Sequence, residues 1–238
     1  MSTSKVEVEQ HGELACWRIT TPRAELLIAQ QGAQVLSYQR VGEPPLLWLS
    51  DQAIFRQGKS VRAGAPVCWP WFGNLQRNPQ TVQAMYHAAD APAHGLARGR
   101  DWQLLGIDSQ GETVRIDFTL PQALGDLPGW PHTVELTLSI VLGEQLTLTL
   151  SSYNLGNDTV TLSQALHSYF AVSDVRQARV AGVNGLGYIE TLADWQQRTQ
   201  QGDLAFAGET DRIYLQAPDR LSIVDPAWNR RITLSSQG

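Results

Sequence analysis

The clearest strand pattern in the sequence is HTVELTLSIVLGEQLTLTL, residues 132–150. Polar and apolar side chains alternate over residues 132–140 and again over residues 145–150. A period of two places the apolar side chains on one face of an extended chain, which is typical of a strand buried on one side. Gly143-Glu144 stands between the two runs and predicts a turn, so the stretch predicts an antiparallel hairpin.

The same pattern extends outward from this hairpin. Residues 113–120 alternate in the same way, and their Val and Thr content favours a strand. Weaker strands are expected over residues 14–20, 25–29, 35–40, 102–107, 159–166 and 221–224. Only residues 189–200 could form a helix of more than one turn, although their apolar spacing is poor. Many short strands separated by Gly, Pro, Asn and Asp predict an all-β fold with little helix, a large antiparallel β-sandwich or barrel.

The sequence shows no shift in composition that would mark a domain boundary, so we expect a single domain over residues 1–238. Between residues 51 and 100 the alternation lapses, and arginines, aromatics, prolines and glycines take its place. Long loops on a rigid sheet scaffold are where binding groups tend to lie. We therefore expect this segment to form the wall of a site.

Composition and charge narrow the class of protein. The formal net charge is -5 and no basic run occurs, so we expect no nucleic-acid partner. The two cysteines, Cys16 and Cys68, lack the number and spacing of a disulfide framework or a zinc site, which predicts two buried thiols. We find neither a signal-peptide pattern nor an apolar run long enough to span a bilayer. These features predict a cytoplasmic protein that does not enter a membrane.

Two histidines are candidates for proton transfer, because an imidazole titrates near neutral pH. His167 lies in LHSYF, where alternation places it on the same face as Ala165 and Tyr169. It could equally be a structural histidine inside the sandwich. His94 is followed by Gly95, which permits a tight backbone path near a ligand, but it could also be a solvated loop residue.

Other residues are candidates for binding. The guanidinium groups of Arg62 and Arg98 match the geometry of phosphate oxygens, although either could be an ordinary surface charge. The aromatic cluster Trp69, Trp71 and Phe72 could stack on a sugar ring or belong to the core. Asp211 could accept hydrogen bonds from sugar hydroxyls or form a local salt bridge or turn cap.

The candidate residues lie in four motifs that follow one another along the chain: RAGAPVCWPWFG at 62–73, PAHGLAR at 92–98, ALHSYF at 165–170 and TDRIY at 210–214. In this order they resemble the hexose-6-phosphate mutarotases of the aldose 1-epimerase family, and the resemblance covers nearly the whole chain. It implies a galactose mutarotase-like supersandwich that interconverts the α and β anomers of glucose 6-phosphate and similar sugar phosphates without a metal or organic cofactor.

The resemblance also implies roles for individual residues. His167 matches the general acid that protonates the ring oxygen of the sugar. Arg62 and Arg98 match residues that bind the substrate, with its phosphate as the expected contact. His94 and Asp211 match positions that line the sugar site. The implied partner is therefore a small hexose phosphate.

The sequence departs from the family pattern at its end. The family carries its general base, a glutamate, in a closing strand after the TDRIY motif, but no glutamate follows Glu209 here. We expect that the 238 residues lack the family's C-terminal strands and with them the base. Two alternatives remain open: another carboxylate acts as the base, or the chain is a sugar-phosphate binding or regulatory module without turnover.

Overall fold

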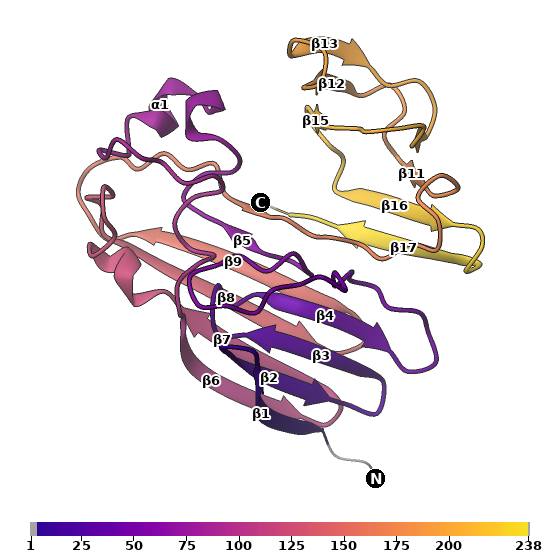
Figure 1. Cartoon of the computed structure of the whole chain (residues 1–238), viewed down its shortest axis with the longest axis horizontal. Helices are drawn as coiled ribbons and strands as arrows, with labels where there is room; N and C mark the ends of the chain where they lie inside the picture. The colour runs from indigo at the N-terminus through magenta and orange to yellow at the C-terminus, as the bar shows by residue number, and fades with distance from the viewer. Residues whose placement is uncertain (1–3, 238) are drawn as a thin grey trace. The chain divides into compact units, whose positions relative to one another are not determined.

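The structure, a computed structural model that describes residues 4–237, consists almost entirely of antiparallel strands (Figure 1). The all-β prediction is confirmed. The chain divides into two compact units, the first ending at Phe170 and the second beginning at Ala171. No helix within the described residues is long and apolar enough to span a membrane.

The first unit contains two four-stranded antiparallel sheets. One sheet has the order β1 (Lys5–His11), β2 (Leu14–Thr20), β3 (Ala24–Ala29) and β4 (Val35–Arg40). The other has the order β6 (Gln103–Gln110), β7 (Thr113–Thr119), β8 (Val134–Leu142) and β9 (Leu146–Asn154). Each sheet therefore runs from one strand to the next along the chain, as short hairpin connections require.

The hairpin predicted from residues 132–150 is confirmed by β8 and β9, which pair from Val134 with Asn154 to Leu142 with Leu146. Alternate residues of β8 are buried, as the period of two requires: Val134, Leu136, Leu138, Ile140 and Leu142. Each fully buried aliphatic side chain of this kind contributes about 1.5–3 kcal/mol relative to an exposed one.

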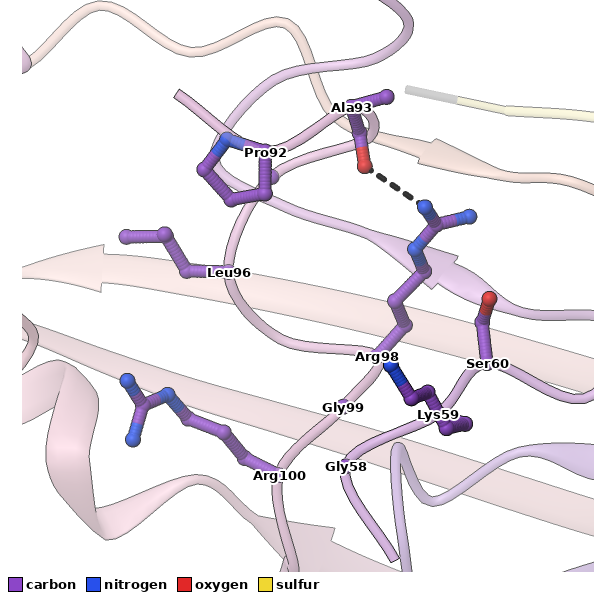
Figure 2. Close-up of a pocket in the computed structure, with 10 residues that line it drawn as sticks. Gly58, Lys59, Ser60, Pro92, Ala93, Leu96, Arg98, Gly99 and Arg100 are labelled. Carbon is purple, nitrogen blue, oxygen red and sulfur yellow. Dashed lines mark hydrogen bonds between the residues drawn. The ribbon is translucent and has the colours of Figure 1, made fainter. Parts of the chain in front are cut away.

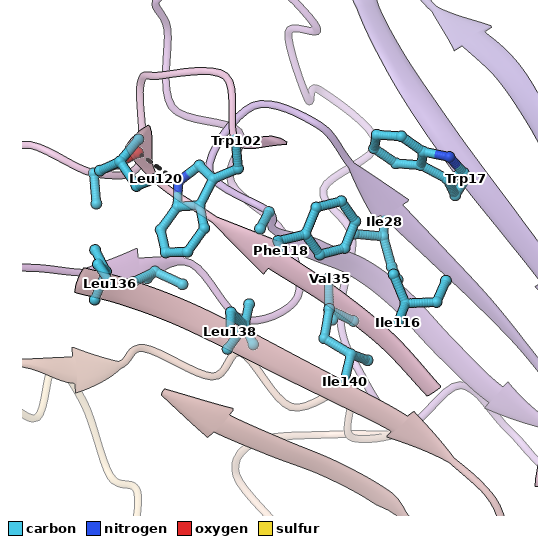
Figure 3. Packing of buried hydrophobic residues seen from close by; sticks show 14 of the residues in the cluster. Trp17, Ile28, Val35, Trp102, Ile116, Phe118, Leu120, Leu136, Leu138 and Ile140 are labelled. Carbon is cyan, nitrogen blue, oxygen red and sulfur yellow. Dashed lines mark hydrogen bonds between the residues drawn. The ribbon is translucent and has the colours of Figure 1, made fainter. Parts of the chain in front are cut away.

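One core joins the inner faces of the two sheets and makes this unit a sandwich (Figure 3). Trp17 of the first sheet meets Phe118 of the second edge to face, with ring centroids 5.1 Å apart. Trp102 lies at the start of the second sheet and closes the core beside Leu120, with its indole N–H donating to the carbonyl of Ala97 at 3.2 Å. The core thus fixes one end of the loop that carries the PAHGLAR motif.

The segment between the sheets, residues 51–100, contains little regular structure, as the loss of alternation predicted. It holds β5 (Val67–Cys68), the 3-10 turn η1 (Leu75–Arg77) and the short helix α1 (Gln80–Gln83). A second 3-10 turn, η2 (Pro121–Leu124), follows β7. The predicted strand over 159–166 is wrong except for β10 (Ala165–Leu166), because only these two residues pair with β5 and the residues before them form an isolated bridge at Ser163.

The second unit has two small antiparallel sheets. The order in one is β14 (Leu204–Ala205), β11 (Arg179–Ala181), β16 (Arg220–Asp225) and β17 (Arg230–Ser235). The order in the other is β13 (Gln196–Thr199), β12 (Gly187–Glu190) and β15 (Arg212–Tyr214). The helix considered over residues 189–200 is wrong, because the chain turns at Asp194 and Trp195, both with positive φ, and returns as β13. The expectation of one domain remains a prediction.

Candidate active site

The site begins with the pairing of β5 and β10, which brings the RAGAPVCWPWFG and ALHSYF motifs together. Immediately after β10, the main-chain N–H of His167 donates to the carbonyl of Pro66 at 3.0 Å. The N–H of Tyr169 donates to the carbonyl of Gly64 at 2.7 Å. His167 and Tyr169 are therefore both bound through their backbone to the segment that precedes β5. Their rings lie on the same side of the chain, as the alternation predicted, with centroids 4.8 Å apart.

The PAHGLAR loop joins the same place from a third part of the sequence. The N–H of Leu96 donates to the carbonyl of Trp69 at 2.7 Å. Gly95 has φ +77°, and a Cβ atom there would lie 2.1 Å from that carbonyl oxygen. The glycine after His94 is thus required by contact with the Trp69 backbone, and its approach to a ligand stays a prediction.

These three motifs bring the two histidines into contact. The imidazoles of His94 and His167 stack with centroids 5.5 Å apart and planes 28° apart. The ring of Phe72 contacts both, at 4.9 Å from His94 and 5.3 Å from His167. Both histidines are half-buried, and Phe72 is 37% exposed. The pair is therefore held by aromatic contacts while remaining open to small molecules.

The surroundings oppose a positive charge on either ring. Burial lowers the pKa of His167, and the positive charge of Arg98 lowers it further. Burial likewise lowers the pKa of His94, with added contributions from Arg98 and His167. A histidine whose pKa falls below its ordinary value is mostly neutral at pH 7 and releases a proton readily once it has gained one.

A cationic cavity of about 480 Å³ lies beside His94 (Figure 2). Its lining residues all come from the segment between 58 and 100, within the part of the chain that we expect to form the wall of a site. Lys59, Arg98 and Arg100 contribute the charge, and none of the lining residues is acidic. Within residues 4–237 these three side chains form no ion pair, although the net charge of the chain is -5. Such a cavity suits an anion.

The loops that form this cavity are fixed by a buried side chain. The amide oxygen of Gln31 accepts from the N–H of Gly58 at 2.6 Å, and its amide nitrogen donates to the carbonyl of Lys59 at 2.7 Å. Arg98 is oriented by its own loop, since Nη2 donates to the carbonyl of Ala93 at 2.8 Å, the dashed line in Figure 2. Fixed donors bind an anion at a smaller entropic cost than mobile ones.

The structure resolves the open question about the aromatic cluster. Trp69 and Trp71 are fully buried, and their indole N–H groups donate to Ser152 Oγ at 3.1 Å and to the carbonyl of Pro92 at 3.1 Å. They belong to the core. Phe72 alone is exposed and contacts the histidines. Cys16 and Cys68 are buried and free, as predicted, and burial raises the pKa of each thiol to about 11.

Two candidate residues remain, Arg62 in the first unit and Asp211 in the second. Arg62 is exposed and does not line the cavity, and its carbonyl accepts from the N–H of Ser50 at 3.2 Å. Asp211 is exposed at the start of β15 in the second unit, where its carbonyl accepts from both the N–H and the hydroxyl of Thr191. The roles of both residues stay predictions.

Lys59 was not among the residues that the sequence singled out, and Arg100 had no assigned role. A single lysine in an irregular segment carries no pattern of its own. The only available signal was its place in the segment expected to line a site. The part of the chain that the structure describes contains no cluster of three or more His, Cys, Asp or Glu side chains suited to a metal ion.

The first unit is therefore an all-β sandwich that presents two stacked histidines and a cavity lined by three cationic side chains. A model of the aldose 1-epimerase family matches residues 15–238 of this chain. The chain belongs to the aldose 1-epimerase family, whose members are isomerases.

Individual relatives agree with this assignment. A candidate glucose-6-phosphate 1-epimerase from Escherichia coli K12 is 34% identical over 217 residues, covering 91% of this chain and 68% of the relative. One from Cenchrus ciliaris is 32% identical, covering 87% of this chain and 62% of the relative. This chain therefore spans roughly two thirds of the length of these curated relatives.

Solved structures confirm the fold. The crystal structure of a candidate mutarotase from Salmonella typhimurium superposes with a TM-score of 0.83 at 29% identity, covering 96% of this chain and 72% of that one. A galactose mutarotase-like protein from Clostridium acetobutylicum gives a TM-score of 0.67 at 16% identity, covering 97% and 80%. The galactose mutarotase-like fold expected from the sequence is confirmed.

Proposed function

We propose that this chain interconverts the α and β anomers of hexose 6-phosphates, with glucose 6-phosphate as the reference substrate and His167 as the general acid. The observation that carries the proposal is the half-buried imidazole of His167 beside a cavity with three cationic side chains. Arg98 connects the two features, because it lines the cavity and its charge acts on the imidazole. The names of the relatives at 32–34% identity support the same substrate.

The reaction needs one proton donated and one accepted. Protonated His167 gives its proton to the ring oxygen while a base removes the proton of the anomeric hydroxyl. The bond between C1 and the ring oxygen breaks, the C1–O bond becomes a carbonyl, and an open-chain aldehyde forms. Rotation about C1–C2 and reclosure on the other face return both protons and give the second anomer. Each acid or base group of this kind contributes about 10²–10⁴-fold to the rate.

The phosphate of the substrate is assigned to the cationic cavity. Lys59, Arg98 and Arg100 lie on loops that Gln31 and backbone hydrogen bonds hold in place. Hydrogen bonds from cationic donors to phosphate are roughly twice as strong as neutral ones, so a phosphate there would anchor the sugar. His94 and Asp211 are proposed to contact the sugar hydroxyls, and Arg62 a further part of the substrate. We expect the protein to act in the cytoplasm, where sugar phosphates are retained.

A second function is favoured by one observation. No glutamate follows Glu209 in the sequence, where the resemblance places the general base. The general base is therefore not assigned to a residue of this chain. A module that binds a sugar phosphate without turning it over would use the same cavity and would need no base.

Exchange NMR of the two anomers of glucose 6-phosphate separates these functions. Exchange above the buffer rate in the 238-residue chain that is lost in the His167→Asn variant would establish the epimerase and would show that another carboxylate of these residues acts as the base. Calorimetry on both proteins serves as the control, since the variant should still bind the sugar phosphate. Saturable binding that weakens in Arg98→Ala, with exchange at the buffer rate, would establish the binding module instead. Absence of both exchange and binding would refute both functions.

A further inference from the structure

The imidazole of His94 is held by the backbone of Gly73 through two reciprocal hydrogen bonds. The main-chain N–H of His94 donates to the carbonyl of Gly73 at 2.7 Å. The main-chain N–H of Gly73 donates to Nδ1 of His94 at 3.2 Å. A ring nitrogen that accepts a hydrogen bond carries no proton, so this contact selects the neutral imidazole with its proton on Nε2.

The groups around the ring favour the same state. His167 is stacked on one face and Arg98 acts as a nearby positive charge, and these are the titratable and charged groups that influence His94. The edge contact comes from Phe72, which is uncharged. Within the described residues no carboxylate pairs with His94. A proton added to Nδ1 would break the bond from Gly73 and place a second positive charge beside Arg98.

The other nitrogen of His94 has a different environment. Nε2 makes no hydrogen bond to any residue between 4 and 237, so its proton is free to bind an oxygen of a ligand. Neither ring nitrogen of His167 has a hydrogen-bond partner in the same range. The two stacked rings therefore differ in one respect: the backbone fixes the tautomer of His94 and leaves that of His167 free to change.

We propose that the N–H of Gly73 locks His94 as a neutral Nε2–H hydrogen-bond donor to the ligand, so that of the two stacked imidazoles only His167 carries a proton to and from the substrate. The role of the ligand in this statement rests on the proposed function. The locked tautomer does not, because it follows from contacts within the chain.

The tautomer can be measured without substrate. A long-range ¹H–¹⁵N correlation spectrum of the ¹⁵N-labelled 238-residue chain distinguishes a ring nitrogen that bears a proton from one that does not. Signals are assigned with the His94→Gln and His167→Asn variants. We expect His94 to show a protonated Nε2 and a bare Nδ1 at pH 7, and to keep this state at pH 6.5, the ordinary pKa of a histidine. A protonated Nδ1 at pH 7, or a half-charged His94 ring at pH 6.5, would overturn the proposal.

Two substitutions of His94 separate the hydrogen bond that Nδ1 accepts from Gly73 from the hydrogen bond that Nε2 would donate to the ligand. The side-chain oxygen of His94→Asn can take the place of Nδ1 and accept from Gly73, but it leaves no donor at the position of Nε2. The amide nitrogen of His94→Gln reaches the position of Nε2 and loses the acceptor. Since His94 has φ 65°, and asparagine tolerates this left-handed conformation better than glutamine, backbone strain alone would favour the asparagine variant.

Binding of glucose 6-phosphate to the two variants is therefore a sharp comparison. We expect His94→Gln to bind within about 3-fold of the parent, and His94→Asn to bind about 10-fold more weakly, the loss of one hydrogen bond. The reverse order would overturn the donor role of Nε2. If the parent chain binds no glucose 6-phosphate, the proposed function and the donor role fail together, while the NMR experiment still decides whether the tautomer is locked.

Discussion

The position of Gly95 provides the most direct test of how the site is built. Replacing Gly95 with alanine adds a Cβ atom 2.1 Å from the carbonyl oxygen of Trp69 and 2.4 Å from its carbonyl carbon. Real Cβ atoms do not approach other atoms this closely, and neither partner is the end of a flexible side chain. The loop must therefore move away from Trp69, which breaks the 2.7 Å hydrogen bond from the N–H of Leu96.

Two costs determine the size of the effect. The left-handed backbone of Gly95, at φ +77°, costs a residue with a Cβ about 1–2 kcal/mol. Loss of a hydrogen bond to a buried carbonyl adds about 1–3 kcal/mol. The same carbonyl also accepts from the N–H of Ala97 at 3.3 Å, and this longer bond belongs to the loop that must move. Trp69 is fully buried, so water cannot replace the lost donors without further opening of the core. We expect Gly95→Ala to lower the free energy of unfolding by about 2–5 kcal/mol in total.

A second glycine isolates the contribution of the contact. Gly42 also has φ +77°, but nothing lies within 4 Å of the position of its Cβ. Gly42→Ala should therefore cost only about 1–2 kcal/mol. Urea unfolding of both variants, followed by tryptophan fluorescence, measures the difference, which we expect to be about 1–3 kcal/mol. Equal destabilisation by the two substitutions would show that the contact with Trp69 does not constrain the backbone at His94 and Gly95.

Three further outcomes are expected. Leu138→Ala, in the centre of the sandwich core, should lower the free energy of unfolding by about 2–5 kcal/mol in urea titrations. Cys16 and Cys68 should react with a thiol reagent at pH 8 only after unfolding, because burial raises both pKa values to about 11, and rapid labelling of the folded chain would contradict this. Folding lowers the pKa of His94 and His167, so the unfolded chain binds more protons below about pH 6.5 and stability should fall as the pH decreases from there. The double variant His94→Asn/His167→Asn should flatten this part of the stability profile, and an unchanged slope would refute the assignment.

The parts of the fold that could be predicted are those where one buried face imposes a period of two. Residues 113–120 and 132–150 became β7, β8 and β9 because each strand contributes alternate side chains to one core. The strand β13 shows no such pattern, since all four of its residues are exposed. Its sequence could not be distinguished from a weak helix. The turn at Asp194 and Trp195, where φ is positive, ends any helix and leads the chain back as a strand.

The site was less predictable than the sheets, for a physical reason. His94 and His167 meet because β5 pairs with β10 over two residues and the loop of His94 is bound to Trp69 through Leu96, and such short contacts leave no periodic signal. The motifs identified these histidines through resemblance, whereas Lys59 belongs to no motif. Lys59 is positioned by a hydrogen bond from Gln31, which lies 28 residues earlier in the chain. Contacts of this kind depend on the folded loop path and cannot be inferred from local sequence.

Arg98 couples the charge of the cavity to the pKa of His167, because it lines the cavity and acts on the imidazole. With the cavity empty, its positive charge helps to lower the pKa of His167 and disfavours the protonated form that a general acid requires. A phosphate bound against Arg98, Lys59 and Arg100 brings negative charge to the same place and opposes that effect. By linkage, whatever a bound phosphate adds to the proton affinity of His167, a proton on His167 adds equally to the affinity for phosphate. Sugar without a phosphate would leave the pKa of His167 low. The cationic cavity would therefore do more than anchor the substrate, because occupation of the cavity would also favour the charged state in which His167 can act as an acid.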